Sequence, residues 1–165
     1  KIHFRDDGSI IQAEMTSCAG CEPLSTEGEY PAYIACNLFC DTESAYTGLP
    51  GEWLDTRFPK ITQDGRDGDE EPGYIANMRD GATAGFKYFK CMGISQFSVW
   101  TRGYCRGFME VKLSWDGDAV GKIPIDYSNI WAGSSAEVKI PDRINSVYIT
   151  YRGSGSAALR SFRMT

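Results

Sequence analysis

The sequence has few of the residues on which many catalytic and nucleic-acid sites depend. It contains a single histidine, His3, which leaves little for histidine-dependent catalysis or for histidine-type metal sites. The net charge is −5, and no cluster of Lys or Arg stands out. Because a nucleic-acid-binding surface needs a positive stripe, we expect no nucleic acid among the partners.

Long apolar runs and a secretory leader are also missing from these 165 residues. No window approaches the roughly 18 consecutive apolar residues of a membrane span, so we expect no membrane partner. No basic segment followed by an apolar run opens the chain, which starts at Lys1 without an initiator Met. We therefore interpret the sequence as a mature or excised piece, long enough for one domain with its own core.

No segment shows the apolar spacing of an amphipathic helix, and the second half alternates with a period of two instead. The alternating segments are residues 96–101, 109–115, 121–125, 136–140 and 146–152. In the second of these, Val111, Leu113 and Trp115 fall on one face. Turn signals such as Asp116-Gly117 separate the segments. Short, half-buried strands at near-even spacing predict an all-β fold, an antiparallel β-sandwich of jelly-roll type.

Residues 16–72 differ from the second half because they are rich in Gly, Pro, Cys and acidic side chains. We expect a long, loop-rich insertion with cysteines here, while residues 73–165 form the main core of a single sandwich module. A structureless stretch of this length is unusual inside a compact domain. It is held either by its cysteines or by the packing of Trp53, Leu54 and Phe58 on the sandwich.

The state of the six cysteines is open from the sequence alone. They are Cys18, Cys21, Cys36, Cys40, Cys91 and Cys105. Disulfides and buried free thiols are the two main alternatives. The third is zinc bound by Cys18, Cys21, Cys36 and Cys40, whose spacing C-x2-C-x14-C-x3-C is close to that of a zinc ribbon. Cys91 and Cys105 flank the strand at 96–101 on opposite sides, which places them too far apart to bridge.

An acidic segment, DGRDGDEEPGY, precedes the apolar residues that follow Tyr74. Its acids are Asp64, Asp67, Asp69, Glu70 and Glu71. An EF-hand loop is excluded because Arg66 and Pro72 occupy positions that need an acid and a glycine. A catalytic carboxylate pair needs a cleft and a fixed spacing, which this loop does not define. We interpret the segment as a solvated approach to the Tyr74 strand, with a minor cation site as the alternative.

Five segments, in order along the chain, resemble family 6 carbohydrate-binding modules. They are residues 9–15 (SIIQAEM), 73–89 (GYIANMRDGATAGFKYF), 107–125, 129–140 and 147–165. The first resembles the opening strand of the family, the second its Gly-Tyr-Ile segment, and the third its strand, Asp-Gly turn and strand. The resemblance implies a sandwich that binds a polysaccharide or an oligosaccharide in a loop-lined cleft at its edge.

The same resemblance implies two aromatic contacts to the sugar. Tyr74 matches the tyrosine of the Gly-Tyr-Ile segment and Trp131 the tryptophan after the long turn, so the two rings would sandwich one sugar. Packing in the core is the alternative for both rings. Asn129 and Tyr127 could add polar contacts or could be solvated turn residues. Ala158 stands where the family has an Asn that reaches a sugar hydroxyl, so binding is expected to be weak, shifted to another glycan, or lost.

A structural calcium ion is also implied, held by Gln12 and Glu14 of the opening strand and by an Asp of the last strand. Here Arg160 stands where that Asp would be. We predict that Arg160 forms a bidentate pair with Glu14 and replaces the ion. The alternative is a calcium ion bound by Gln12, Glu14 and backbone carbonyls, with Arg160 in solvent.

Residues 1–10 (KIHFRDDGSI) resemble the final strand and turn of a family 43 glycoside hydrolase propeller. This resemblance implies that residues 1–9 are the tail of an upstream catalytic domain of the same polypeptide, and that the whole protein is a secreted bacterial enzyme. We expect the chain itself to be a monomer.

The expected function is therefore that of a non-catalytic module. It would hold xylan or arabinoxylan, which are hemicelluloses, near an attached glycoside hydrolase domain. A structural module that braces the propeller and binds no sugar is the first alternative. A small glycosidase in its own right is the second.

Overall fold

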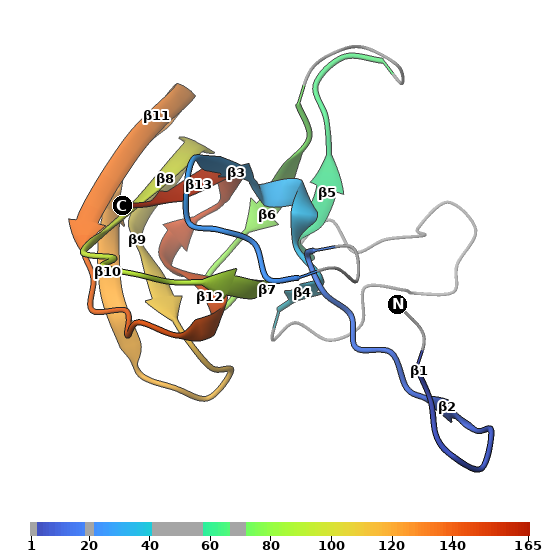
Figure 1. The fold of residues 1–165 in the computed structure, drawn as a ribbon. Helices are drawn as coiled ribbons and strands as arrows, with labels where there is room; N and C mark the ends of the chain where they lie inside the picture. Colours follow the sequence, from blue (N-terminus) through green and yellow to red (C-terminus); the bar gives the residue numbers. More distant parts are fainter. Residues whose placement is uncertain (1–2, 19–21, 41–57, 67–71) are drawn as a thin grey trace.

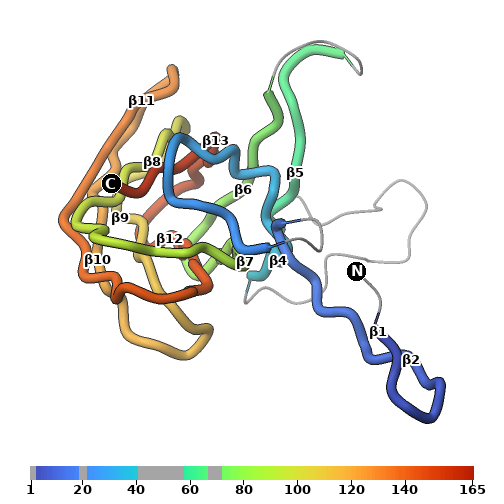
Figure 2. The backbone as a smooth tube through the Cα atoms, in the orientation of Figure 1, coloured from blue at the N-terminus to red at the C-terminus, as the bar shows by residue number. Residues whose placement is uncertain are grey.

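The computed structural model of the protein describes residues 3–18, 22–40, 58–66 and 72–165. Within these ranges all the regular structure is β-strand except for one short 3-10 helix, η1 (Ala32–Ile34). Two sheets face each other in Figure 1, and Figure 2 traces the same path as a tube. The predicted all-β sandwich is confirmed. No helix among the described residues is long and apolar enough to cross a membrane.

Both sheets of the sandwich are antiparallel. The first has the strand order β10 (Ala119–Ile125), β9 (Cys105–Lys112), β12 (Ile144–Gly155), β7 (Thr83–Lys90) and β4 (Asn37–Phe39). The second has the order β11 (Ser128–Glu137), β8 (Gln96–Gly103), β13 (Ala157–Met164), β6 (Tyr74–Met78) and β5 (Lys60–Thr62), with β3 (Glu29–Pro31) also paired to β13. The central strands β12 and β13 therefore follow one another in the chain and lie in opposite sheets.

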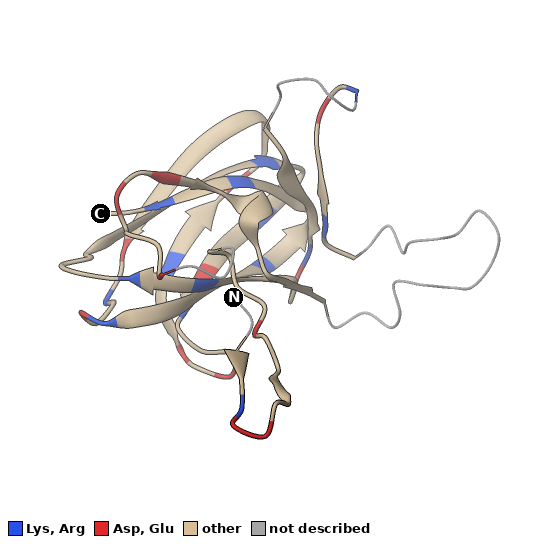
Figure 3. Ribbon diagram, turned by 45° about the vertical axis from the view of Figure 1, so that its right-hand side comes forward, with Lys and Arg blue, Asp and Glu red and all other residues tan. Residues whose placement is uncertain are grey.

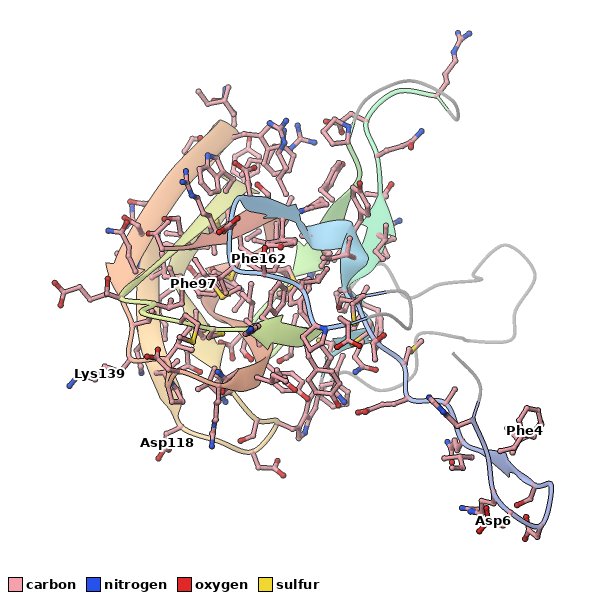
Figure 4. All side chains as sticks on the ribbon, in the orientation of Figure 1. Phe4, Asp6, Phe97, Asp118, Lys139 and Phe162 are labelled. Carbon is pink, nitrogen blue, oxygen red and sulfur yellow. The ribbon has the colours of Figure 1, made fainter. Side chains whose placement is uncertain are left out.

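Stacked phenylalanines fill the space between the sheets. The ring of Phe162 on β13 lies 4.7 Å from that of Phe86, 5.8 Å from that of Phe89 and 5.6 Å from that of Phe97, measured between centroids. All four side chains are fully buried. Figure 4 shows Phe97 and Phe162 in the interior of the sandwich. Removing a side chain of this size from water stabilises the fold by about 2–3 kcal/mol, so this cluster joins the two layers.

The alternating pattern of the sequence places the core residues correctly, with one exception. The fully buried residues among the predicted inward positions are Phe97, Val99, Met109, Val111, Val147, Ile149 and Tyr151. Trp115 was expected on the same face as Val111 but is 43% exposed. The alternation ends with β9 at Lys112, and the chain then turns. Trp115 therefore packs on Phe39 at the surface, with ring centroids 4.9 Å apart.

The segment expected as the opening strand does not join the sandwich. β2 (Ile10–Ile11) pairs with β1 (His3–Phe4) in a hairpin that projects away from both sheets in Figure 1. All of residues 9–15 are exposed. The place beside β13 is taken by β3, because its Tyr30 ring can pack on the core phenylalanines. The prediction that residues 9–15 open the sandwich is therefore wrong.

Residues 16–72, expected as an insertion, supply edge strands to both sheets. β4 extends the first sheet, and β3 and β5 extend the second. Phe58 packs against the core, whereas Trp53 and Leu54 lie outside the described residues. The boundaries proposed from the sequence, with residues 1–9 as a tail and 73–165 as the main core, stay predictions.

The described cysteines are all buried. They are Cys18, Cys36, Cys40, Cys91 and Cys105, and no disulfide joins any two of them. Burial raises the pKa of the thiols of Cys36, Cys91 and Cys105, so these side chains behave as small apolar residues. No group of three metal-ligating side chains gathers among the described residues, and Cys21 lies outside them. The zinc site stays a prediction.

Candidate functional site

A cleft of about 690 Å³ opens at the end of the sandwich where β6, β8 and β11 meet the connections between the sheets. The side chains that determine its chemistry are Tyr74, Asn77, Arg79, Arg102, Tyr104 and Asn129. No Asp or Glu of the described chain lines it. The cleft therefore offers aromatic rings, amide groups and guanidinium cations. Figure 3 shows no stripe of one charge sign elsewhere on the two sheets.

Tyr74 lines this cleft, whereas Trp131 is not among its lining residues. The two rings lie together but do not form two parallel walls. Their ring centroids are 5.3 Å apart and their planes meet at 67°, an edge-to-face contact that leaves no slot for a sugar. The guanidinium carbon of Arg102 lies 4.9 Å from the Tyr74 ring and 4.3 Å from the Trp131 ring. This cation covers the aromatic surface that a sugar ring would use. We call Tyr74 and Trp131 the closed pair, and Arg102 is the arginine that covers it.

Asp64 fixes this arginine. The Nη2 of Arg102 donates to Asp64 Oδ1 at 2.7 Å, and the Tyr74 hydroxyl donates to the same oxygen at 3.0 Å. The hydrogen bond from Arg102 holds the pKa of Asp64 below its ordinary value. Asp64 therefore does not belong to a merely solvated loop, which corrects the interpretation for this residue. The other acids, Asp67, Asp69, Glu70 and Glu71, lie outside the described residues.

Asn77 and Asn129 supply amide groups to the cleft. Asn77 has a φ of 62°, a left-handed conformation that Asn tolerates better than most residues. Its Nδ2 donates to the Phe58 carbonyl at 3.2 Å, which leaves the side-chain oxygen to accept from a ligand. Asn129 lines the cleft as expected, and so does Ala158, which brings no polar group. Sequence reasoning missed Asn77.

Tyr127 reaches the cleft through a second aromatic residue, Tyr104. The two ring centroids lie 4.9 Å apart, and the ring planes are tilted by 33°. Tyr104 lines the cleft and is 80% exposed, and Tyr127 is 51% exposed. Sequence reasoning missed Tyr104, although its place directly after the turn signal Arg102-Gly103 is a usable sign. An aromatic residue in a tight turn has no neighbouring strand to cover it.

No family model matches the chain. The chain is 64% identical over 165 residues to a xylosidase/arabinosidase from Thermoclostridium stercorarium, and this match covers 99% of the chain. The match covers 35% of the relative, so the chain spans about a third of the length of the curated relative it matches.

Solved structures agree on the fold. A family 6 module from Clostridium stercorarium in complex with cellobiose superposes with a TM-score of 0.67 at 11% identity, covering 87% of this chain and 97% of that one. A family 6 module from Clostridium cellulolyticum in complex with xylose gives 0.65 at 15% identity, covering 86% and 98%. The chain has the fold of a family 6 carbohydrate-binding module. A family 43 arabinoxylan arabinofuranohydrolase from Bacillus subtilis, in complex with cellotetraose, gives 0.62 at 16% identity and covers 100% of this chain and 33% of that one.

In this chain, Arg160 and Glu14 do not pair, and that prediction is wrong. Glu14 accepts from Lys87 Nζ at 2.6 Å and from the Tyr88 hydroxyl at 2.5 Å. The guanidinium carbon of Arg160 lies 5.8 Å from the Trp131 ring instead. The reason is the strand order, because β3 and not the Glu14 segment runs beside β13.

The calcium site proposed at Gln12 and Glu14 stays a prediction. Both carboxylate oxygens of Glu14 already accept hydrogen bonds, and the hydrogen bond from Lys87 holds the pKa of Glu14 below its ordinary value. Gln12 is exposed on the same segment. No group of three His, Cys, Asp or Glu side chains that could hold a metal ion forms among the described residues. An ion at Glu14 would have to displace Lys87.

Proposed function

We propose that the chain is a non-catalytic carbohydrate-binding module that holds xylan or arabinoxylan at the cleft beside Tyr74 and Asn129. The observation that carries this is a cleft of about 690 Å³ with aromatic, amide and guanidinium side chains, on a family 6 fold. Sugar rings pack their C–H faces on aromatic rings, and their hydroxyls need a few polar partners. The longer relative is named as a xylosidase/arabinosidase, which supports a hemicellulose ligand.

An attached glycoside hydrolase domain is the second part of the proposal. The match to the family 43 enzyme covers the whole chain, whereas the matches to the isolated modules cover 86% and 87% of it. This fits the proposal that residues 1–9 are the tail of a neighbouring catalytic domain. A tethered module raises the local concentration of polysaccharide around that domain without doing chemistry. We further propose that the protein is secreted, bacterial and monomeric.

The absence of hydrolysis by the chain itself is also proposed. Hydrolysis of a glycosidic bond usually needs two carboxyl groups that flank the bond. No carboxylate of the described residues lines the cleft, and the nearby Asp64 is engaged by Arg102 and Tyr74. Product release from arylglycosides by the purified chain would contradict this part.

A structural module that braces the catalytic domain and binds no sugar is the second candidate. Two observations favour it: the closed pair leaves no slot between Tyr74 and Trp131, and Ala158 brings no polar group.

Affinity electrophoresis in gels with xylan, arabinoxylan or no polysaccharide separates the two candidates. We expect retardation by at least one of the two xylans. Tyr74→Ala should remove most of it while the circular dichroism spectrum stays unchanged. Tyr33→Ala is the matched control, because Tyr33 is a 43% exposed tyrosine outside the cleft. If neither xylan slows the migration of the unmodified chain, the bracing role is favoured.

A further inference from the structure

The cleft is cationic, although the chain as a whole is acidic with a net charge of −5. Its lining includes two arginines, Arg79 and Arg102, and no Asp or Glu of the described residues. Asp64 balances one of these guanidinium groups, because its carboxylate accepts from Arg102 at 2.7 Å. The positive charge of Arg79 is therefore left over at this end of the sandwich.

Arg79 has no partner of opposite charge among the described residues. Its side chain is exposed, and no ion pair or side-chain hydrogen bond joins it to the described part of the chain. The adjacent Asp80 is engaged elsewhere, because its Oδ1 accepts from the Gly153 backbone N–H at 3.0 Å and its Oδ2 lies 4.0 Å from Arg152 Nη1. The Arg79 carbonyl accepts from the Ala82 N–H at 2.8 Å, which fixes the backbone from which the side chain extends. The guanidinium is thus available to an anion from solution.

The neutral groups that share the cleft with Arg79 suit a sugar ring. The phenol ring of Tyr74 lines the cleft, and so do the amide groups of Asn77 and Asn129. Amides bind the hydroxyls of a sugar. A guanidinium instead matches a carboxylate, because its planar fork can donate two parallel hydrogen bonds to the two oxygens. The lining therefore combines groups for a sugar ring with one group for a carboxylate, and a uronic acid is a sugar that carries both.

We propose that the cleft selects xylan that carries uronic acid side chains, with the uronate carboxylate paired to Arg79. This rests on the proposed function and deepens it, because it names an anionic hemicellulose as the ligand. Arg79 is then the residue that determines specificity for charge. Tyr74 and the two amides bind the neutral part of the polysaccharide, and Arg102 stays with Asp64.

Calorimetric titration with two matched polymers tests the charge selectivity. The first is glucuronoxylan, and the second is the same polymer after its carboxyl groups have been reduced to alcohols. The unmodified chain should bind the first about tenfold more tightly, because a hydrogen bond to a charged group contributes about that much more than one to a neutral group. Raising the NaCl concentration to about 1 M, where the Debye length is about 3 Å, should remove most of this preference.

Substitutions of Arg79 test which residue reads the carboxylate. Arg79→Gln should reduce the preference to within about twofold, whatever it does to the affinity for the neutral polymer. Arg79→Lys keeps the charge but loses the planar fork, so its preference should lie between the two. Arg163→Gln is the matched control, because Arg163 is an exposed arginine of β13 outside the cleft. It removes the same charge from the chain and should keep the tenfold preference. Circular dichroism checks that each variant is folded.

The outcomes separate this proposal from the function on which it rests. If the unmodified chain binds both xylans equally well, or if Arg79→Gln keeps the tenfold preference, the pairing of a uronate with Arg79 is wrong and the proposed function stands. Polygalacturonate, which carries uronates but no xylose, tests the source of the carboxylate. Tighter binding to polygalacturonate than to glucuronoxylan would overturn both proposals, because the ligand would then be pectic. If the unmodified chain binds none of the three polymers, the proposed function fails and the uronate proposal with it.

Discussion

The two aromatic pairs at the same end of the sandwich have opposite surroundings. Tyr74 and Trp131 meet edge to face under the guanidinium of Arg102, which Asp64 holds at 2.7 Å. Tyr104 and Tyr127 lie 4.9 Å apart with their ring planes tilted by 33°, and they are 80% and 51% exposed. The first pair is the one that family resemblance singles out, and the second is the one that is open to a ligand.

The difference shows that aromatic residues alone do not define a binding surface. A cation over a ring face is worth roughly 0.5–1 kcal/mol at an exposed site. A sugar that enters between Tyr74 and Trp131 must first displace Arg102 and separate the two rings. A ligand should therefore bind first at the polar groups of the cleft.

The largest expected effect comes from disturbing the backbone that positions Tyr104 beside Tyr127. Gly155 has a φ of 76°, and a Cβ there would overlap the carbonyl oxygen of Tyr104. Gly155→Ala combines a left-handed backbone with a backbone clash, so we expect it to lower the free energy of unfolding by about 3 kcal/mol or more. Urea unfolding measures it. The contact between the Tyr104 and Tyr127 rings should be lost while Tyr74 and Trp131 keep theirs.

Gly93 is the matched control for that substitution. It has a φ of 64°, but a Cβ there would meet nothing within 4 Å. Gly93→Ala should cost only about 1 kcal/mol, the strain of a left-handed alanine. If both variants lost equal stability, the clash with Tyr104 would not be the cause.

The next effect, smaller, opens the closed pair. Arg102→Met keeps the aliphatic stem and removes the cation from both rings, so we expect a loss of about 1 kcal/mol in unfolding free energy. The tryptophan fluorescence of Trp131 should change as well, because its ring face becomes exposed. Arg106→Met is the control: Arg106 is 80% exposed and its partner Asp126 67%, so its loss should not change stability measurably. An unchanged stability for Arg102→Met would mean that the ion is incidental.

The sequence predicted the sandwich because period-two alternation reports burial directly. Phe97, Val99 and Ile149 are buried where the pattern put them. The prediction failed at Trp115, because strand β9 ends at Lys112, before the alternating pattern ends. The cleft was predicted in part. Tyr74 and Asn129 line it, but the stacking of Arg102 on two rings depends on contacts between three separate strands.

The opening strand shows a different limit. Residues 9–15 match the family's opening strand in sequence, yet β3 occupies the place beside β13. What decides the pairing is the burial of Tyr30 against the phenylalanine cluster, a contact between distant residues. A sequence motif does not show which of two segments buries more apolar surface against the core. The prediction of a Glu14–Arg160 pair was wrong for the same reason, because it assumed that residues 9–15 lie beside β13.

The pH dependence of the closed pair should be smaller still. The hydrogen bond from Arg102 lowers the folded-state pKa of Asp64 below its ordinary value of 3.8. Above that pH the ionised carboxylate stabilises the fold, and this contribution is lost as the pH falls through the lowered pKa. Because the Asp64 side chain is 47% exposed, the gain should stay under about 1 kcal/mol. The unfolding free energy of Asp64→Asn should therefore lie below that of the unmodified chain at neutral pH and meet it in acid. A gap that widened in acid would contradict the assignment.

The smallest expected effect tests whether Lys87 or Arg160 is the ion-pair partner of Glu14. Lys87 pairs with Glu14 at 2.6 Å, with side chains 18% and 54% exposed, respectively. A double-mutant cycle of Glu14→Gln and Lys87→Met should give a coupling free energy of about 0.5 kcal/mol, typical of an exposed ion pair. The same cycle with Arg160→Met should give none, because the guanidinium carbon of Arg160 lies 5.8 Å from the Trp131 ring and Glu14 is bonded to Lys87 and Tyr88 instead. A coupling of about 1 kcal/mol or more between Glu14 and Arg160 would restore the pair that the strand order excludes. It would also mean that Arg160 does not lie beside Trp131, so that Arg102 would be the one described cation near that ring.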